Sequence, residues 1–243
     1  MANKVNLTIN GKTVQAEPGG WLLKACRDAG FEVPSLCNND AVEPQGRCRL
    51  CSVEVQDRGR TRIVVSCHYP VKEGIVVQTA SPRVLAVRKL VLELLWARVP
   101  GSEHIRGLAR RHGITAPRFK VAEDMHKKCI LCGLCVRACR EIVGVSAISL
   151  HSRGSDKRLG TPFSEASTVC IGCGTCVYIC PTNAVSMEQV GDKRVFPRWH
   201  TEFKMKKCKV CGNYFAPERQ LEYIQKKFNL PGDFFDVCPT DRV

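Results

Sequence analysis

The chain has 243 residues, with 37 basic side chains, 23 acidic side chains and 16 cysteines. Its 44% of hydrophobic and 25% of charged residues are ordinary for a globular protein, which excludes wholesale disorder and collagen-like repeats. A membrane span is also excluded, because the longest apolar stretch, residues 84–95, is broken by Arg88, Lys89 and Glu93.

The N-terminal segment alternates apolar and polar residues up to Asn10-Gly11, which predicts a strand entering a hairpin rather than a signal peptide. We therefore expect a cytoplasmic, reducing location, where cysteines bind metals more often than they form disulfides. Further strands are expected over residues 13–16, 52–56, 62–66 and 76–79, with a short helix over 21–29. This order predicts a β-grasp ferredoxin domain. Cys26 falls on the helix and is expected to be a small buried core residue.

The first cysteine group, C-x10-C-x2-C-x15-C, consists of Cys37, Cys48, Cys51 and Cys67. A plant-type [2Fe-2S] site places one cysteine on a loop, a C-x2-C pair after it and the fourth cysteine further along the chain. The group matches this pattern with a longer loop between its first two members, so it predicts one [2Fe-2S] cluster. Zinc is the alternative, because both metals use a C-x2-C pair.

A helix should connect this domain to the next cysteines. Ser81-Pro82 predicts its N-cap and first turn, and Pro100 predicts its end near residue 98. An apolar stripe runs along it, made of Val84, Val87, Val91 and Leu95 with Leu90 and Leu94 beside them. We expect the stripe to pack in a core, with contact to another subunit as the alternative.

The motif C-x2-C-x2-C-x3-C then occurs twice, and Pro181 follows the second copy. Three thiolates within seven residues can bind one [4Fe-4S] cluster, while the fourth cysteine reaches the other cluster. This rule assigns Cys129, Cys132, Cys135 and Cys180 to one [4Fe-4S] cluster and Cys139, Cys170, Cys173 and Cys176 to a second. Positive backbone φ angles are expected at Gly133, Gly172 and Gly174. The alternatives are zinc, which prefers separated cysteine pairs, and disulfides.

The last cysteines are Cys208, Cys211 and Cys238, and Asp241 stands where two zinc knuckles would have a fourth cysteine. A carboxylate is an acceptable zinc ligand, so these four residues predict a zinc-ribbon-like site. An Asp-ligated [2Fe-2S] cluster, a site that uses His200 instead and a site without metal are the alternatives.

Between the knuckles, residues 217–228 predict a helix with Leu221, Ile224 and Phe228 on one face. Because this tail follows all the redox motifs, we expect its loosening to affect assembly with a partner more than it affects the clusters.

The formal net charge of +14 overstates the charge of the loaded protein. Oxidised clusters with four thiolates carry about −2 each and a three-thiolate zinc site about −1, which leaves about +7. The basic run at residues 204–209 is most simply a solvated face, with binding of phosphate or of an acidic partner as the alternative.

Motifs of bond-making catalysis are missing from the sequence. It contains no P-loop, no HExxH and no Ser/His/Asp array, and the pair Gly172 and Gly174 lacks the third glycine of a dinucleotide fingerprint. We therefore expect no catalytic residues. Redox centres without a substrate site are typical of an electron relay.

Two stretches carry a family resemblance: PSLC…GRCRLCSVEV…VSCHYPV, and KCILCGLCVRACREIVGVSAISL…CIGCGTCVYICPTNAV. They resemble the iron–sulfur subunit of NAD-reducing hydrogenase diaphorases, the start of the large iron–sulfur subunit of respiratory complex I, and the N-terminal region of iron-only hydrogenases. The resemblance covers about residues 3–190. It implies partner subunits that hold FMN, NAD(H) and the terminal catalytic site.

One departure from the family concerns the connector. The family commonly has a further [4Fe-4S] cluster there, held by one histidine and three cysteines, whereas residues 68–128 contain His104 and no cysteine. We expect that cluster to be absent.

Together these patterns predict an α+β chain of four parts. They are a β-grasp [2Fe-2S] domain (1–80), a helical connector (81–123), a bacterial-type dicluster [4Fe-4S] domain (124–190) and a C-terminal metal tail (191–243). The expected function is electron transfer between a flavin/NAD(H) subunit and a hydrogenase, a formate dehydrogenase or an electron-bifurcating reductase. A free polyferredoxin is one alternative. A cluster-based sensor that binds nucleic acid is the other, although we do not expect nucleic acid as a partner.

Overall fold

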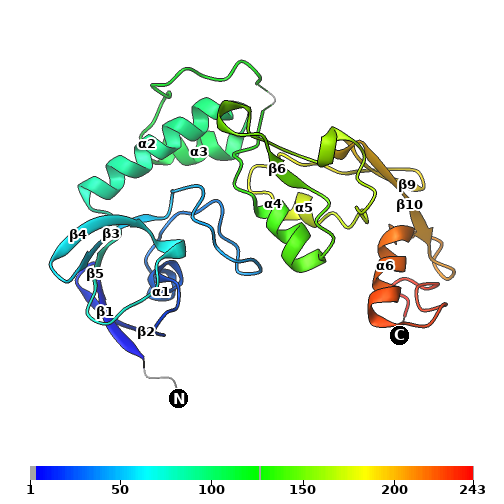
Figure 1. Ribbon diagram of the computed structural model, residues 1–243, viewed down its shortest axis with the longest axis horizontal. Coiled ribbons are helices and arrows are strands. Elements are labelled where there is room, and N and C mark those ends of the chain that lie inside the picture. The colour runs from blue at the N-terminus through cyan, green and yellow to red at the C-terminus, as the bar shows by residue number, and fades with distance from the viewer. Residues whose placement is uncertain (1–3, 126, 243) are drawn as a thin grey trace. The chain divides into compact units, whose positions relative to one another are not determined.

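The computed structural model describes residues 4–125 and 127–242 (Figure 1). The chain forms two compact units, which meet in the sequence between Cys132 and Gly133. This boundary lies inside the first C-x2-C-x2-C-x3-C motif. Among the helices in the described residues, none has the length and apolarity that crossing a membrane requires.

The first unit is built on a five-stranded mixed sheet with the strand order β2-β1-β5-β3-β4. The strands are β1 (Val5–Ile9), β2 (Lys12–Ala16), β3 (Ser52–Asp57), β4 (Arg60–Val65) and β5 (Val76–Gln78). β1 and β5 are parallel, and the other neighbours are antiparallel. Asn10 and Gly11 both have positive φ, as the predicted Asn-Gly hairpin requires. A mixed sheet with these strands agrees with the sequence prediction for the N-terminal domain.

Helix α1 (Leu22–Asp28) contributes Leu22, Leu23 and Cys26 to the core of this unit, which β1, β3 and β5 complete. Cys26 is 0% exposed, so the prediction of a buried core residue is confirmed. Burial raises the pKa of its thiol to about 11. Cys26 therefore stays a neutral thiol and packs as a small apolar side chain.

Helix α2 (Pro82–Arg98) has the predicted bounds, and the Ser81 hydroxyl accepts a hydrogen bond from the Val84 N–H at 3.3 Å. The predicted apolar stripe is only partly right. Leu90 and Leu94 are exposed, whereas Arg88 and Glu93 are buried. The two charged side chains tolerate burial because each has a specific partner, the Ser52 carbonyl at 2.8 Å for Arg88 and the Arg118 guanidinium for Glu93.

Helix α3 (Glu103–Arg111) follows and packs on α2. His104 is exposed on its first turn. The short helix η1 (Ser66–His68) lies earlier in the same unit, directly after β4.

The second unit has two sheets. A two-stranded sheet pairs β6 (Ser149–His151) with β7 (Arg158–Gly160), and a four-stranded sheet has the order β11-β10-β9-β8. The latter strands are β8 (Glu188–Val190), β9 (Lys193–Phe196), β10 (Thr201–Lys207) and β11 (Tyr214–Pro217). The helical elements are α4 (Leu134–Arg137), the π-helical segment η2 (Ala138–Val143), η3 (Gly154–Asp156), η4 (Pro162–Ser164), α5 (Thr175–Tyr178), η5 (Pro197–Trp199) and α6 (Glu218–Phe228).

Helix α6 packs on β10 and β11 (Figure 1). Leu221 is buried, as predicted, but Phe228 is 64% exposed. Phe228 is the last residue of the helix before Asn229, which has positive φ, so it lies at the end of the packed face rather than within it.

The C-terminal tail is attached to the second cysteine motif and to η2, which carries Cys139 of the first motif. The Arg194 guanidinium donates to the Gly172 carbonyl at 3.1 Å, and the Tyr223 hydroxyl donates to the Val143 carbonyl at 2.9 Å. A Cβ atom on Gly172 would lie 2.7 Å from the Phe203 ring. The tail therefore packs directly against the loops that carry the cysteines.

This close packing at Gly172 predicts the effect of adding one methyl group there. Gly172→Ala and Gly191→Ala both place alanine at positive φ, which costs about 1–2 kcal/mol in each variant. Only Gly172→Ala also causes overpacking, which adds about 1–3 kcal/mol, because nothing lies within 4 Å of the Cβ position at Gly191. We expect faster hydrogen exchange of β9 and β10 amides in Gly172→Ala than in Gly191→Ala. Equal rates in the two variants would show that the packing contributes nothing.

Candidate metal centres

The first cysteine group converges in the first unit. Cys37 and Cys48 lie in the long loop after α1, Cys51 directly precedes β3, and Cys67 lies in η1. All four are buried. The Cys48 N–H donates to the Cys37 sulfur at 3.3 Å, and thiol hydrogen bonds join Cys37 to Cys48 and Cys67, and Cys67 to Cys51. Four sulfur atoms from three chain segments therefore form one buried cluster of ligands.

The pKa values of these thiols are shifted because the thiols form hydrogen bonds with one another. Hydrogen bonds from Cys48 and Cys67 lower the pKa of Cys37 to about 2, and the same bonds raise the pKa values of Cys48 and Cys67. A hydrogen bond from Cys67 also lowers the pKa of Cys51, to about 7, so without metal the group is a mixture of thiolates and neutral thiols. Positive iron ions would allow all four sulfurs to be deprotonated, so the donor set fits a metal cluster.

Arg88 is a neighbour of this group that the sequence did not single out. Its buried guanidinium donates to the Ser52 carbonyl. Negative charge on Cys51 favours the charged form of this guanidinium. The signal in the sequence that could have indicated this role is a basic residue among the apolar residues of one helix face. The role of Arg88 was missed because the pattern of residues around it is that of an ordinary apolar helix face.

One cavity of the second unit is lined by the second predicted set of cysteines, namely Cys139, Cys170, Cys173 and Cys176. The rest of its wall is mostly apolar and includes Val143, Ile148, Ile171, Phe196 and Trp199. The Ala147 N–H donates to the Cys139 sulfur at 3.2 Å. Burial raises the pKa of Cys176 to about 12. The structure thus brings the second predicted set of four cysteines together, in mostly apolar surroundings.

The loops around these cysteines have the predicted backbone conformations. Gly133, Gly172 and Gly174 have φ of 73°, 70° and 79°. Gly133 and Gly174 each immediately precede a short helix, α4 and α5, which carry Cys135 and Cys176. Positive φ at these positions lets the chain turn from the cysteine loop into a helix.

The other predicted [4Fe-4S] set is divided by the boundary between the units. Cys129 and Cys132 end the first unit, while Cys135 and Cys180 belong to the second. The Ala184 N–H donates to the Cys180 sulfur at 3.2 Å. The assignment of these four cysteines to one cluster stays a prediction from their spacing.

The ligand atoms of Cys208, Cys211, Cys238 and Asp241 all lie within 4.8 Å of one another. The first pair lies in the turn between β10 and β11, and the second pair follows α6. The Cys208 and Cys238 thiols donate to Asp241 Oδ2 at 3.2 Å and 3.1 Å. Hydrogen bonds from the Cys211, Cys238 and Cys208 thiols lower the pKa of the Asp241 carboxyl. This spacing fits a single ion with Zn–S bonds of about 2.3 Å.

The tail is closer to the redox motifs than the sequence indicated. Phe196 and Trp199, which lie after residue 190, line the same cavity as the second set of four cysteines. That loosening the last residues affects assembly with a partner more than the clusters stays a prediction, whereas the part of the tail at residues 196–199 lies in the wall of this centre. Contacts between residues so far apart in the sequence produce no periodic pattern from which they could be predicted.

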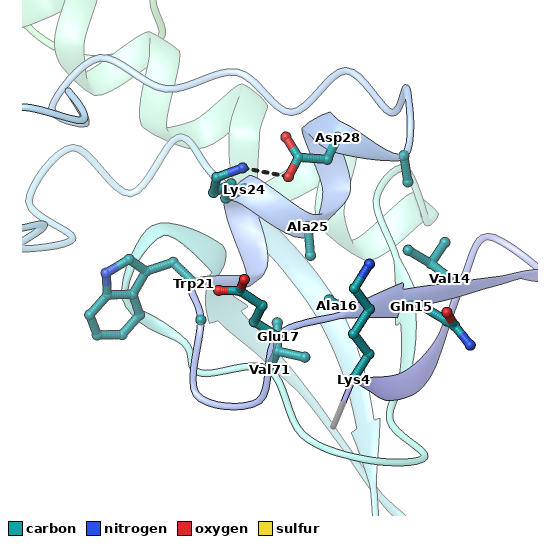
Figure 2. A pocket seen from close by; sticks show the side chains of 12 residues that line it. Lys4, Val14, Gln15, Ala16, Glu17, Trp21, Lys24, Ala25, Asp28 and Val71 are labelled. Carbon is teal, nitrogen blue, oxygen red and sulfur yellow. Dashed lines mark hydrogen bonds and ion pairs between the residues drawn. The ribbon is translucent and has the colours of Figure 1, made fainter. Parts of the chain in front are cut away.

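A different hollow, of about 290 Å³, lies beside β2 and α1 in the first unit. Figure 2 shows its lining side chains, among which Lys24 and Asp28 form an ion pair at 2.6 Å. Its lining includes none of the cysteines of the first group. This hollow is therefore separate from the candidate [2Fe-2S] site.

Comparison with known protein families gives two matches. Residues 2–82 match the 2Fe-2S iron-sulfur cluster binding domain. Residues 169–241 match the 4Fe-4S dicluster domain. The second match begins at the second C-x2-C-x2-C-x3-C motif and extends over the C-terminal cysteines. The chain therefore has 2Fe-2S and 4Fe-4S domains.

Similar proteins belong to NAD(P)-linked redox complexes. The chain is 33% identical over 74% of its length to the HndD subunit of the NADP-reducing hydrogenase of Solidesulfovibrio fructosivorans. It is 31% identical over 75% of its length to the mitochondrial NADH-ubiquinone oxidoreductase 78 kDa subunit of Neurospora crassa. It spans 36% and 27% of the lengths of these two relatives.

Among solved structures, an NAD⁺-reducing [NiFe]-hydrogenase in the H₂-reduced state is similar, with a TM-score of 0.62 and 28% identity. The match covers 79% of this chain and 87% of that one. The predicted resemblance to iron–sulfur subunits of NAD-reducing hydrogenases and of complex I is thus confirmed.

The convergence of the first cysteine group predicts the effect of removing one ligand. Anaerobically purified protein should contain about ten iron atoms per chain, and Cys48→Ser should contain about eight. EPR of the reduced variant should lack the [2Fe-2S] signal and keep the [4Fe-4S] signals. Cys26→Ala is the control, because Cys26 is a buried thiol outside the group, and it should keep every signal. Loss of the [4Fe-4S] signals in Cys48→Ser would contradict this division of the cysteines.

Proposed function

We propose that the chain is an electron-transfer subunit of an NAD(P)-linked oxidoreductase complex. It relays electrons between a flavin/NAD(H) subunit and a terminal redox subunit. The observation that carries the proposal is the set of converging cysteines in both units, nearly all buried or partly buried, in a sequence without a catalytic motif. The similar proteins, which are parts of NAD(P)-linked hydrogenases and of NADH oxidoreductases, support it.

In this proposal each cluster has a defined ligand set. Cys37, Cys48, Cys51 and Cys67 bind a [2Fe-2S] cluster. Cys129, Cys132, Cys135 and Cys180 bind one [4Fe-4S] cluster, and Cys139, Cys170, Cys173 and Cys176 bind the other. When bound, the clusters accept and donate single electrons. The residues of the chain hold them, donate N–H groups to their sulfurs and limit the access of water.

The terminal partner is a hydrogenase, a formate dehydrogenase or an electron-bifurcating reductase, and the complex is cytoplasmic. The hydrogenases among the similar proteins favour the first of these. A free polyferredoxin would need no flavin/NAD(H) partner. Co-migration of this chain with much larger subunits in native size-exclusion chromatography would distinguish the two.

The C-terminal site binds one zinc ion in this proposal. Its four ligand atoms lie closer together than the ligands of a cluster would, because several metal atoms separate the ligands of a cluster. The dicluster match over residues 169–241 favours the alternative of a further iron–sulfur centre. Elemental composition distinguishes these two occupants.

The relay proposal predicts how the purified chain behaves with NADH. It should neither bind NADH or flavin nor reduce a dye with NADH as donor, because its sequence has no loop that binds phosphates. NADH should reduce its clusters only after the flavin subunit is added. The measurement is the absorbance of the oxidised clusters under anaerobic conditions. NADH oxidation by the pure chain would rule out a relay without its own substrate site.

The zinc proposal predicts about one zinc per chain besides about ten iron atoms. Asp241→Cys should retain zinc, because it restores a four-thiolate site, whereas Asp241→Ala should lose affinity for it. Asp233→Ala is the control, since this nearby carboxylate is not one of the four ligands. Plasma emission spectrometry gives both metals in one measurement. About twelve iron atoms without zinc would instead indicate an Asp-ligated [2Fe-2S] centre.

A further inference from the structure

Trp199 is the largest fully buried side chain in the described residues, with 1% of its surface exposed. It lies in η5, between β9 and β10, in the C-terminal tail. It also lines the cavity that Cys139, Cys170, Cys173 and Cys176 share. A tail residue is thus part of the wall around the second set of cysteines.

The indole N–H of Trp199 is buried and meets no acceptor within hydrogen-bond distance in the part of the chain that the structure describes. A buried donor without an acceptor destabilises the folded state. Cys176 lines the same cavity and is the sulfur-bearing side chain with which the indole interacts. A further acceptor inside this cavity would satisfy the indole N–H.

We infer that the Trp199 indole N–H donates a hydrogen bond to a sulfur of the [4Fe-4S] cluster, at or next to Cys176. The tail then belongs to the binding site of this cluster, besides holding its own metal. This inference rests on the proposed ligand set of Cys139, Cys170, Cys173 and Cys176. A hydrogen bond to a cluster sulfur stabilises the reduced, more negative state, so Trp199 raises the reduction potential of this cluster.

The segment on the N-terminal side of Trp199 is held by two contacts. Phe196 lies three residues before it and packs edge-on against Phe203, with ring centroids 6.0 Å apart. The adjoining strand β9 is tied to the cysteine loop by the hydrogen bond from Arg194 to the Gly172 carbonyl. The chain segment that carries the indole is therefore anchored beside the cavity.

The test is Trp199→Phe in the full chain, which keeps an aromatic ring in the wall and removes the N–H. EPR-monitored redox titration should show one [4Fe-4S] centre shifted to lower potential, with the iron content and the [2Fe-2S] potential unchanged. Trp96→Phe is the matched control, because Trp96 lies on α2 in the first unit, and it should shift no potential. Unchanged [4Fe-4S] potentials in a fully loaded Trp199→Phe variant would overturn the inference.

A measurement on the unaltered chain guards against a variant that fails to fold. With indole-¹⁵N tryptophan incorporated, pulsed EPR of the reduced protein should detect a weak ¹⁵N coupling to one [4Fe-4S] centre. Absence of this coupling would overturn the inference. Cys173→Ser identifies the centre, since it should remove the coupled signal. If both [4Fe-4S] signals survive in Cys173→Ser, the proposed ligand set fails first, and the inference fails with it.

Discussion

Backbone N–H groups directed at cysteine sulfur recur in every part of this chain that gathers cysteines. The donors and acceptors are Cys48 to Cys37, Ala147 to Cys139, Ala184 to Cys180, and Val210 and Cys238 to Cys208. A thiolate that is removed from water keeps its charge only where such donors replace the lost hydration. The loops must therefore turn tightly around each sulfur, which explains positive φ at Gly133, Gly172 and Gly174. Sheets and helices serve to hold these loops in place.

Thiolates that are brought together also require positive charge nearby. Arg88 is 4% exposed beside Cys51, and Arg137 is 1% exposed between Cys135 and Cys139 in the sequence. A buried cation is unfavourable unless negative charge lies nearby. Part of the excess of basic residues therefore belongs inside the protein next to the cysteines, and the solvated surface is less basic than the composition alone indicates.

The sequence predicted features whose determinants are local. The cysteine spacing grouped three sets that converge in the structure, and Ser81-Pro82 located the start of α2. It did not predict that Arg88 and Glu93 replace apolar residues on that helix, because their partners lie 36 and 25 residues away. Trp199 was missed for the same reason. Trp199 lines a cavity together with cysteines that are distant in the sequence, and a single residue forms no spacing pattern that could predict this contact.

The location of Trp199 and Phe196 in the wall of the second cavity has a consequence for biosynthesis. Translation proceeds from the N-terminus, so Cys139, Cys170, Cys173 and Cys176 leave the ribosome before the residues that cover them. A cluster inserted into the nascent chain would face solvent, and its sulfide would be open to attack by oxygen. If these four cysteines bind a cluster, as proposed, the segment through β10 must emerge and fold before its site is closed.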